Sequence, residues 1–345
     1  MPAIETSRPA GDVFLRKQES RGAEEHARPV KLVIQIPCYN EEQSLPVTLS
    51  HLPRSVQGID VVEWLIIDDG STDRTLEIAR QHGVDHIVRL PHNQGLACAF
   101  MAGLRACLAA GADVIVNTDA DNQYNADDIP SLVAPILQGR AEIVVGCRPI
   151  DDIAHFSAFK KLLQKVGSWV VRVASKTDIP DAPSGFRAMH RNAASQLNVF
   201  SEYTYTLETI IQAGQKHMAI TWVPVRVNGY LRPSRLIRSI PRYVWRSLVT
   251  ILRIFIVYRP LAFFMTLSAV VMAPGILAVL RFLYLYSIGQ GAGHVQSLVL
   301  GSSLVVLGFI IVVVGIVSDL IAVNRKLLED LRARELLDRT ETKHG

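Results

Sequence analysis

Two carboxylates separated by one small residue, Asp119-Ala120-Asp121, directly follow the short apolar run 114–117. If this run is a β-strand, both carboxylates lie where the strand ends, and alternate residues there point the same way. Carboxylate oxygens with open coordination positions suit Mg²⁺ or Mn²⁺ bridging two phosphates, and Gln123 adds a neutral oxygen. An isolated Asp-x-Asp pair is weak evidence, because aspartate is common in turns. A metal site at Asp119, Asp121 and Gln123 is therefore an expectation that depends on its context.

Polar clusters of the same kind follow two earlier apolar runs. Cys38-Tyr39-Asn40-Glu41 comes after the run 32–36, and Asp68-Asp69-Gly70-Ser71-Thr72-Asp73 comes after the run 61–67. Ligands of parallel sheets bind beyond the carboxyl ends of the strands. The three clusters are therefore predicted to lie along one edge of a sheet.

Strand and helix patterns alternate from Lys31 to about Met218. The predicted strands are 32–36, 61–67, 86–90, 114–117 and 142–146, and the predicted helices are 45–52, 72–82, 95–110 and 127–137. These assignments follow from Val- and Ile-rich runs and from helical apolar spacing. The alternation predicts an α/β fold with a mostly parallel sheet covered by helices on both faces.

Composition limits the remaining choices. The chain has 345 residues, of which 49% are hydrophobic and 20% charged, so the apolar residues must be concentrated in particular segments. Residues 1–29 are polar and lack the apolar core of a signal peptide, which predicts a disordered cytosolic tail. The four cysteines form no Cys-x-x-Cys pair and are expected to be reduced. A net charge of +4 is too small to indicate binding to nucleic acid.

A basic segment at 234–259 has the pattern of helices that lie on a membrane. Five arginines fall on one face of a helical wheel, beside Trp and Phe: Arg235, Arg238, Arg242, Arg246 and Arg253. Such a stripe favours interfacial helices that bind lipid headgroups. A solvated cytosolic helix face is the alternative.

Two charge-free stretches, 261–280 and 295–318, are each long enough to cross a hydrocarbon core of about 30 Å. They predict a transmembrane hairpin over 260–323, followed by a cytosolic tail at 324–345. The connection 286–297 carries no Lys or Arg, so the positive-inside rule places both termini in the cytosol, at the cytoplasmic membrane. Gly301, Gly308 and Gly315 recur every seven residues and permit close helix packing, within the chain or in a homo-oligomer.

Four motifs occur in order at the predicted strand ends. They are Pro37-Cys38-Tyr39-Asn40-Glu41-Glu42, Asp68-Asp69-Gly70-Ser71-Thr72-Asp73, Asn93-Gln94-Gly95 and Asp119-Ala120-Asp121. As a set they resemble the nucleotide-sugar-binding half of family 2 glycosyltransferases with the GT-A fold, over about residues 31–148. This resemblance implies a GT-A domain at 30–233.

Three later motifs refine the resemblance. Ser184-Gly185-Phe186-Arg187, Val223-Pro224-Val225 and Arg232-Pro233-Ser234-Arg235 look like the polyprenyl-phosphate glycosyltransferase branch, which includes dolichol-phosphate mannosyltransferase and bactoprenol glucosyltransferase. Three residues differ from those that are frequent at the same motif positions in the family: Cys38, Asn122 and Leu96. These differences affect the expected sugar and base preference more than the expected reaction.

The resemblance implies a role for each matched residue. The nucleotide-binding residues would be Pro37, Tyr39, Asn40, Glu41, Asp69, Asn93, Gly95, Asp119 and Ala120. Asp119, Asp121 and Gln123 would hold the metal. The acceptor phosphate would bind Arg187, Arg232, Ser234 and Arg235. The catalytic residues would be Asp119, Asp121, Arg148 and Arg187.

Physical chemistry fits this assignment independently of the resemblance. A sugar that leaves a nucleoside diphosphate develops negative charge on the β-phosphate, which a divalent cation and arginines stabilise. A lipid monophosphate has a second pKa near about 6 and is largely dianionic at neutral pH, so a general base is optional. We expect inverting transfer of a hexose from a UDP- or GDP-sugar to a polyprenyl phosphate at the cytosolic membrane face.

Three other functions share part of this pattern. A processive polysaccharide synthase would need a Gln-x-x-Arg-Trp segment and more spans, and a dinucleotide-dependent oxidoreductase would need Gly-x-Gly-x-x-Gly after the first strand; the sequence has neither. A non-catalytic membrane scaffold or flippase partner with a glycosyltransferase-like domain stays open, although intact Asp119 and Asp121 argue against it.

Overall fold

The computed structural model describes residues 29–149, 175–199, 205–228, 259–290 and 293–341, together with positions 168, 169, 171, 172, 249, 252, 253 and 256. The expected N-terminal tail, except residue 29, lies outside these residues, as does most of the basic segment 234–259. Arg232, Ser234 and Arg235, which the sequence assigns to the acceptor phosphate, also lie outside them.

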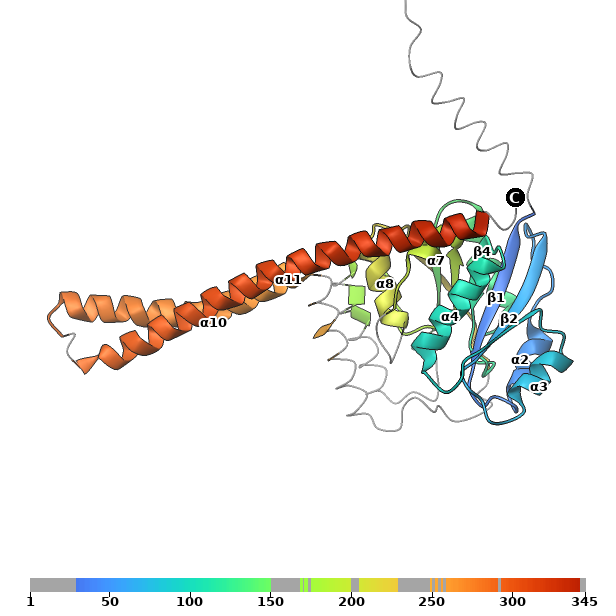
Figure 1. The fold of residues 1–345 in the computed structure, drawn as a ribbon, viewed down its shortest axis with the longest axis horizontal. Coiled ribbons are helices and arrows are strands. Elements are labelled where there is room, and N and C mark those ends of the chain that lie inside the picture. The colour runs from blue at the N-terminus through green and yellow to red at the C-terminus, as the bar shows by residue number, and fades with distance from the viewer. Residues whose placement is uncertain are drawn as a thin grey trace, which may run out of the picture.

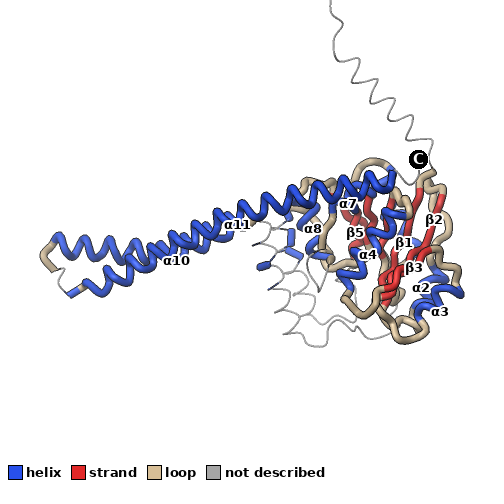
Figure 2. The backbone as a smooth tube through the Cα atoms, in the orientation of Figure 1, coloured by secondary structure: helices blue, strands red, loops and turns tan. Residues whose placement is uncertain are grey.

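Seven strands form one sheet within the described residues, in the order β3-β2-β1-β4-β6-β5-β7 (Figure 2). They are β1 (Lys31–Cys38), β2 (Val61–Asp68), β3 (His86–Arg89), β4 (Val114–Asn117), β5 (Ile143–Cys147), β6 (Arg187–His190) and β7 (Ile220–Pro224). Only β6 runs antiparallel to its neighbours, β4 and β5. The predicted α/β fold with a mostly parallel sheet is confirmed, and the five predicted strands are β1 to β5.

Helices cover both faces of the sheet because successive residues of the central strands point to opposite sides. In β1, Leu32 and Ile34 pack with α2 (Leu45–His51), α3 (Thr75–Gln81) and α5 (Ile129–Leu137). Val33 packs on the other face with α4 (Leu96–Ala109) and α7 (Arg191–Gln196). A short 3₁₀ helix, η1 (Ala126–Asp128), precedes α5, and α8 (Thr206–Gln215) precedes β7. The strands therefore have the nearly continuous burial that is typical of a parallel sheet.

Two long apolar helices, α10 (Pro260–Ser287) and α11 (Val295–Glu341), form a hairpin that extends away from the sheet (Figure 1). Within them, Pro260–Ser287 and Val295–Arg325 are each long and apolar enough to cross a membrane. In each helix, only 11% of the most apolar 18-residue segment is buried within the protein. Large exposed apolar surfaces of this kind mark membrane or protein contacts, so the hairpin fits a membrane-associated protein.

The glycine repeat of α11 lies in the contact between the two helices. A Cβ on Gly301 would lie 2.9 Å from the Gly275 carbonyl oxygen, and a Cβ on Gly315 would lie 2.8 Å from Cβ of Phe264. Ser268 donates a hydrogen bond of 2.8 Å to the carbonyl oxygen of Gly308. The small residues thus pack α11 against α10 of the same chain, as small residues do in membrane helix pairs.

The second helix does not end at the predicted membrane boundary. The sequence predicts a tail from residue 324, whereas α11 continues as a single helix to Glu341. Its C-terminal part packs against α7 and α4 of the sheet domain, as Figure 1 shows in red. One helix therefore connects the apolar hairpin to the domain that carries the carboxylates.

Candidate active site

The carboxylates predicted to bind a metal lie at the carboxyl end of β4. Asp119 and Asp121 follow this strand by two and four residues. The turn that contains them is fixed locally, because Gln123 donates its backbone N–H to Asp121 Oδ1 at 3.1 Å and Asn122 takes a left-handed φ of 55°. Asparagine tolerates this conformation better than most residues. Asp119 and Asp121 therefore lie just before a tight turn at Asn122.

Asp119 lies among charged and polar groups from three other segments. Gly185 lies near it, since a Cβ added to Gly185 would be 3.2 Å from both Asp119 carboxylate oxygens. The pKa of Asp119 is raised to about 7, chiefly by burial and next by the nearby charge of Asp121, while Arg148 opposes the shift. Two carboxylates that repel each other in a partly buried site are suited to a cation.

The loop after β1 is held by the loop after β2. Asn40, with a left-handed φ of 54°, receives a hydrogen bond from the Thr72 backbone N–H at its side-chain oxygen (2.9 Å), and its own N–H donates to Ser71 Oγ (3.0 Å). Glu41 is buried and accepts a hydrogen bond of 2.5 Å from Ser44. Tyr39 is 41% exposed, so its ring is available to stack on a planar base.

Asp69 connects the second strand end to the Asn93-Gln94-Gly95 loop. One carboxylate oxygen accepts the Gln94 N–H at 2.7 Å and the other accepts the Gly95 N–H at 2.9 Å. Gly70 has a φ of +73°, and a Cβ on it would come within 2.6 Å of the His92 carbonyl carbon. Glycine is therefore required for this close approach. Two motifs that are 25 residues apart in sequence share one hydrogen-bonded loop.

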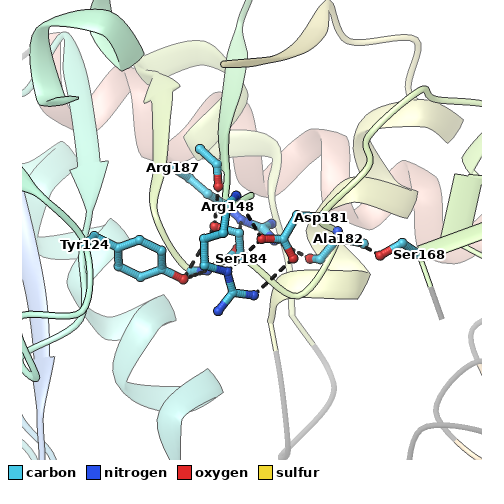
Figure 3. A network of polar contacts seen from close by, with 9 residues as sticks. Tyr124, Arg148, Ser168, Asp181, Ala182, Ser184 and Arg187 are labelled. Carbon is cyan, nitrogen blue, oxygen red and sulfur yellow. Dashed lines mark hydrogen bonds and ion pairs between the residues drawn. The ribbon is translucent and has the colours of Figure 1, made fainter. Parts of the chain in front are cut away.

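Arg148 and Arg187 both bind the loop 181–185 (Figure 3). Arg148 donates Nε to Asp181 Oδ2 at 2.7 Å and Nη2 to Oδ1 at 3.0 Å. Arg187, which is 1% exposed, donates Nε to the Ser184 carbonyl and Nη2 to the Ala182 carbonyl, each at 2.9 Å. Its third nitrogen, Nη1, donates to Thr209 Oγ1.

The structure therefore brings most of the predicted site residues to one edge of the sheet. Pro37, Tyr39, Asn40, Glu41, Asp69, Asn93, Gly95, Asp119, Ala120, Asp121, Gln123 and Arg148 all follow or end strands β1, β2, β4 and β5, or belong to the loop bound to Asp69. Arg187 begins β6 and points into the protein, where all three of its guanidinium nitrogens have protein partners.

Several residues that support the site were not singled out from the sequence. Asp181 pairs with Arg148, and the hydroxyl oxygen of the buried Tyr124 accepts hydrogen bonds from the Gly185 N–H at 3.0 Å and from Ser184 Oγ at 3.5 Å. Asn117, at the end of β4, donates Nδ2 to the Gly185 carbonyl at 2.9 Å and to the Tyr205 hydroxyl at 2.8 Å. A polar residue at the end of an otherwise apolar strand is the signal that could have identified Asn117.

Comparisons with known proteins agree with this geometry. The family model described as Glycosyl transferase family 2 matches residues 33–197. An uncharacterized glycosyltransferase of Mycobacterium tuberculosis is 32% identical over 216 residues, which cover 59% of this chain and 92% of that protein. A UDP-N-acetylglucosamine–dolichyl-phosphate N-acetylglucosaminyltransferase of Methanococcus voltae is 30% identical, over 55% of this chain and 83% of that protein.

Two further proteins complete the comparison. The undecaprenyl-phosphate mannosyltransferase of Micrococcus luteus is 32% identical over 159 residues, 44% of this chain, and the match spans only 63% of that protein. Among solved structures, glucosyl-3-phosphoglycerate synthase from Mycobacterium tuberculosis, in complex with Mn²⁺, UDP and phosphoglyceric acid, superimposes with a TM-score of 0.51 at 20% identity. It covers 66% of this chain and 80% of that chain.

The structural likeness establishes the GT-A fold. The sequence identity over nearly the whole length of the mycobacterial relative, together with the ordered carboxylate motifs at the sheet edge, establishes the family: this chain belongs to glycosyl transferase family 2.

Proposed function

We propose that the protein transfers a hexose from a UDP- or GDP-sugar to a polyprenyl phosphate, with inversion, at the cytosolic face of the membrane. The observation that carries the proposal is the position of Asp119 and Asp121. They lie at the binding edge of a GT-A sheet whose chain continues into an apolar hairpin. A water-soluble acceptor would not require that hairpin.

A divalent cation, Mg²⁺ or Mn²⁺, fits the donor set at Asp119 and Asp121. Among the described residues there is no group of three or more His, Cys, Asp or Glu side chains that could enclose a metal. Two carboxylates alone are the ligand set of a cation whose coordination is completed by substrate phosphates and water. The raised pKa of Asp119 also supports a cation there, and the structural relatives were crystallised with Mn²⁺ or Mg²⁺ and UDP. When bound, the cation would offset the charge that develops on the leaving β-phosphate.

The protein's own residues would then bind and orient the two substrates. Tyr39 and Asp69 flank the loops proposed to hold the nucleoside, and Gln123 would add a neutral oxygen beside the metal carboxylates. Arg148, which is 9% exposed at its side chain, lies beside Asp119 and would offset repulsion between two phosphorylated substrates. Arg232, Ser234 and Arg235 would add acceptor-phosphate contacts from the segment next to the membrane.

A lipid acceptor is supported by both the hairpin and the relatives. The relatives from Micrococcus luteus and Methanococcus voltae are named for transfer to undecaprenyl phosphate and dolichyl phosphate. The positive-inside distribution of Arg and Lys supports a cytosolic sheet domain. The basic segment 234–259 would contact the lipid headgroups between the domain and the hairpin.

The test is a transfer assay with the full chain in membranes or detergent. Labelled UDP- and GDP-sugars are supplied with a polyprenyl phosphate and Mg²⁺ or Mn²⁺, and the label in the lipid extract is counted. We expect metal-dependent labelling that a chelator abolishes and that Asp121→Asn reduces by about 10²-fold or more. Asp178→Asn serves as the control because its side chain is 92% exposed.

The alternative class, a non-catalytic scaffold or flippase partner, predicts a different result. Such a protein gives no labelled lipid with any donor, although it inserts into membranes normally. Labelling that survives Asp121→Asn would instead contradict the assigned metal role while leaving the transfer reaction in place. NMR of the intact glycosyl phosphate lipid, whose anomeric configuration is compared with that of the donor, would test inversion.

A further inference from the structure

Asp181 holds Arg148 through three separate contacts. Besides the two guanidinium hydrogen bonds, the backbone N–H of Arg148 donates to Asp181 Oδ2 at 3.2 Å. The Arg148 and Asp181 side chains are 9% and 1% exposed, so this ion pair is almost fully withdrawn from water. A two-pronged contact of this kind fixes the plane of a guanidinium group.

Asp181 is itself held in place by its loop. Its carbonyl oxygen accepts the Ser184 N–H at 3.2 Å, and the next residue, Ala182, receives a hydrogen bond from Arg187. Figure 3 shows both arginines converging on this loop from the ends of two adjacent strands. The carboxylate of Asp181 is therefore a fixed anchor for Arg148.

On its other side Arg148 interacts electrostatically with Asp119, whose pKa it lowers against the larger effect of burial. The guanidinium also lies over the Tyr124 ring, 5.9 Å from the centroid. Arg148 is thus hydrogen-bonded to one carboxylate, that of Asp181, and interacts through space with a second, that of Asp119. An arginine that instead paired with Asp119 would occupy the oxygens proposed to bind the cation.

We propose that Asp181 is a positioning residue that holds Arg148 away from Asp119, which leaves the Asp119 carboxylate open to a divalent cation. The inference rests on the metal site of the proposed function. Its sequence signature is an aspartate three residues before Ser184 of the Ser-Gly-Phe-Arg motif.

Competition between Arg148 and the cation for Asp119 makes a prediction that a purely structural role of Asp181 does not make. Asp181 and Asp119 are the two carboxylates that act on Arg148, so loss of the Asp181 carboxylate leaves Asp119 as the partner for which the arginine would compete with the cation. Removal of Arg148 abolishes this competition. Loss of Asp181 should therefore weaken cation binding only while Arg148 is present.

The experiment is a double-mutant cycle on the full chain in detergent, with Mn²⁺ alone as the probe and free Mn²⁺ measured by EPR. The proteins are wild type, Asp181→Asn, Arg148→Gln and the double variant. We expect Asp181→Asn to raise the Kd for Mn²⁺ about tenfold in the wild-type background. In the Arg148→Gln background it should change the Kd less than about twofold.

A matched control tests whether loss of any arginine-bound carboxylate has the same effect. Asp85 accepts the Trp64 N–H at 2.7 Å and a hydrogen bond from Arg54, but it precedes β3, at the amino end of the sheet. Asp85→Asn should lower thermal stability and leave Mn²⁺ affinity unchanged. An equal loss of Mn²⁺ affinity in Asp85→Asn would overturn the inference.

The single variant Asp181→Asn leaves a buried arginine unpaired and is expected to be the least stable of the set. If it does not fold, the double variant is compared with wild type, because it removes the competing arginine without leaving either partner of the buried pair alone. Equal Kd values for Mn²⁺ in the two proteins support the positioning role, whereas weaker Mn²⁺ binding by the double variant contradicts it. Absence of Mn²⁺ binding by wild type also contradicts it.

The outcomes separate this inference from the proposed function. Lipid labelling by wild type with no coupling between Asp181 and Arg148 would retain the transfer reaction and overturn the positioning role. Coupling in the Mn²⁺ titration without any labelled lipid would retain the positioning role and overturn the transfer reaction.

Discussion

Gly185 lies close to Asp119, and a Cβ at this position would be crowded between Asp119 and Tyr205. A Cβ at position 185 would be 3.2 Å from each carboxylate oxygen of Asp119 and 2.9 Å from the Tyr205 hydroxyl. Tyr205 cannot move aside easily, because it is fully buried and stacked on Phe100 with ring centroids 3.9 Å apart. The Ser-Gly-Phe-Arg motif therefore contributes a gap beside the Asp119 carboxylate, the proposed cation ligand.

We predict that Gly185→Ala displaces the Asp119 carboxylate and lowers both Mn²⁺ affinity and turnover, each by about tenfold or more. The physical reason is that the added methyl group and the carboxylate cannot both keep their places in a packed site. Mn²⁺ titration and the lipid-labelling assay measure the two effects. Gly293→Ala is the control, since nothing lies within 4 Å of a Cβ there. Unchanged Mn²⁺ affinity in Gly185→Ala would show that the gap has no role in cation binding.

The metal-free protein should be destabilised by the charge of Asp119. Its pKa is about 7 in the folded protein, chiefly because of burial, against about 3.9 in an unfolded chain. Between these values the folded state binds more protons than the unfolded state, so this group lowers stability as pH rises from about 4 to about 7. Above pH 7 the full penalty is present.

We therefore predict that Asp119→Asn raises the Tm in the presence of a chelator at pH 8, by about 2–4 °C, and that this gain disappears near pH 4. Mn²⁺ should then raise the Tm of wild type but not of Asp119→Asn. Differential scanning calorimetry at both pH values makes the comparison. A variant less stable than wild type at pH 8 without metal would contradict the assigned environment of Asp119.

The sequence predicted the carboxylate edge correctly for a physical reason. In a parallel sheet the order of strands and helices alone determines that Tyr39, Asp69 and Asp119 emerge on the same side. Local spacing therefore suffices to group residues that are 80 positions apart, and β1 to β5 are found where the alternation places them.

The direction of individual side chains could not be predicted in the same way. The sequence motif predicts that Arg187 binds the acceptor phosphate. Arg187 begins β6, which lies antiparallel between β4 and β5. From there its guanidinium reaches the Ala182 and Ser184 carbonyls. The pairing of Arg148 with Asp181, 33 residues away, depends on the same insertion. The second helix was expected to end near residue 323, whereas Leu327, Leu328 and Leu331 keep a helical spacing and α11 continues to Glu341.

The Asp69 contacts predict a defect in donor binding. Asp69→Asn keeps the shape of the side chain but replaces one acceptor oxygen with an NH₂ group, so the N–H groups of Gln94 and Gly95 cannot both be satisfied. An unpaired amide costs about 1–3 kcal/mol, and the loop before α4 should loosen. We expect the KM for the nucleotide sugar to rise about tenfold with a smaller change in kcat.

Hydrogen exchange at 92–96 checks the cause of that defect. Faster exchange there, with unchanged exchange in β4, is the expected result. An unchanged KM combined with faster exchange would mean that the loop is dispensable for the donor. A raised KM combined with unchanged exchange at 92–96 would place Asp69 in direct contact with the nucleoside.

The glycine repeat of α11 gives the last prediction, which concerns the hairpin. Gly308 faces Met272 of α10 so closely that a Cβ cannot fit without displacing that side chain, and the Gly308 carbonyl accepts the Ser268 hydrogen bond. We predict that Gly308→Val separates α10 from α11 and lowers the detergent-solubilised Tm by several degrees. Gly293→Ala should leave the Tm unchanged. Because α11 also packs on α4 and α7, a tilted α11 would shift the sheet domain relative to the bilayer, so transfer to a long polyprenyl phosphate should fall more than Mn²⁺ binding does. If the repeat instead served association between copies, Gly308→Val would convert an oligomer to monomers, as measured by light scattering. The contact between Ser268 and Gly308 within one chain would then stay intact. Cysteine cross-linking at residues next to these two positions tests that contact.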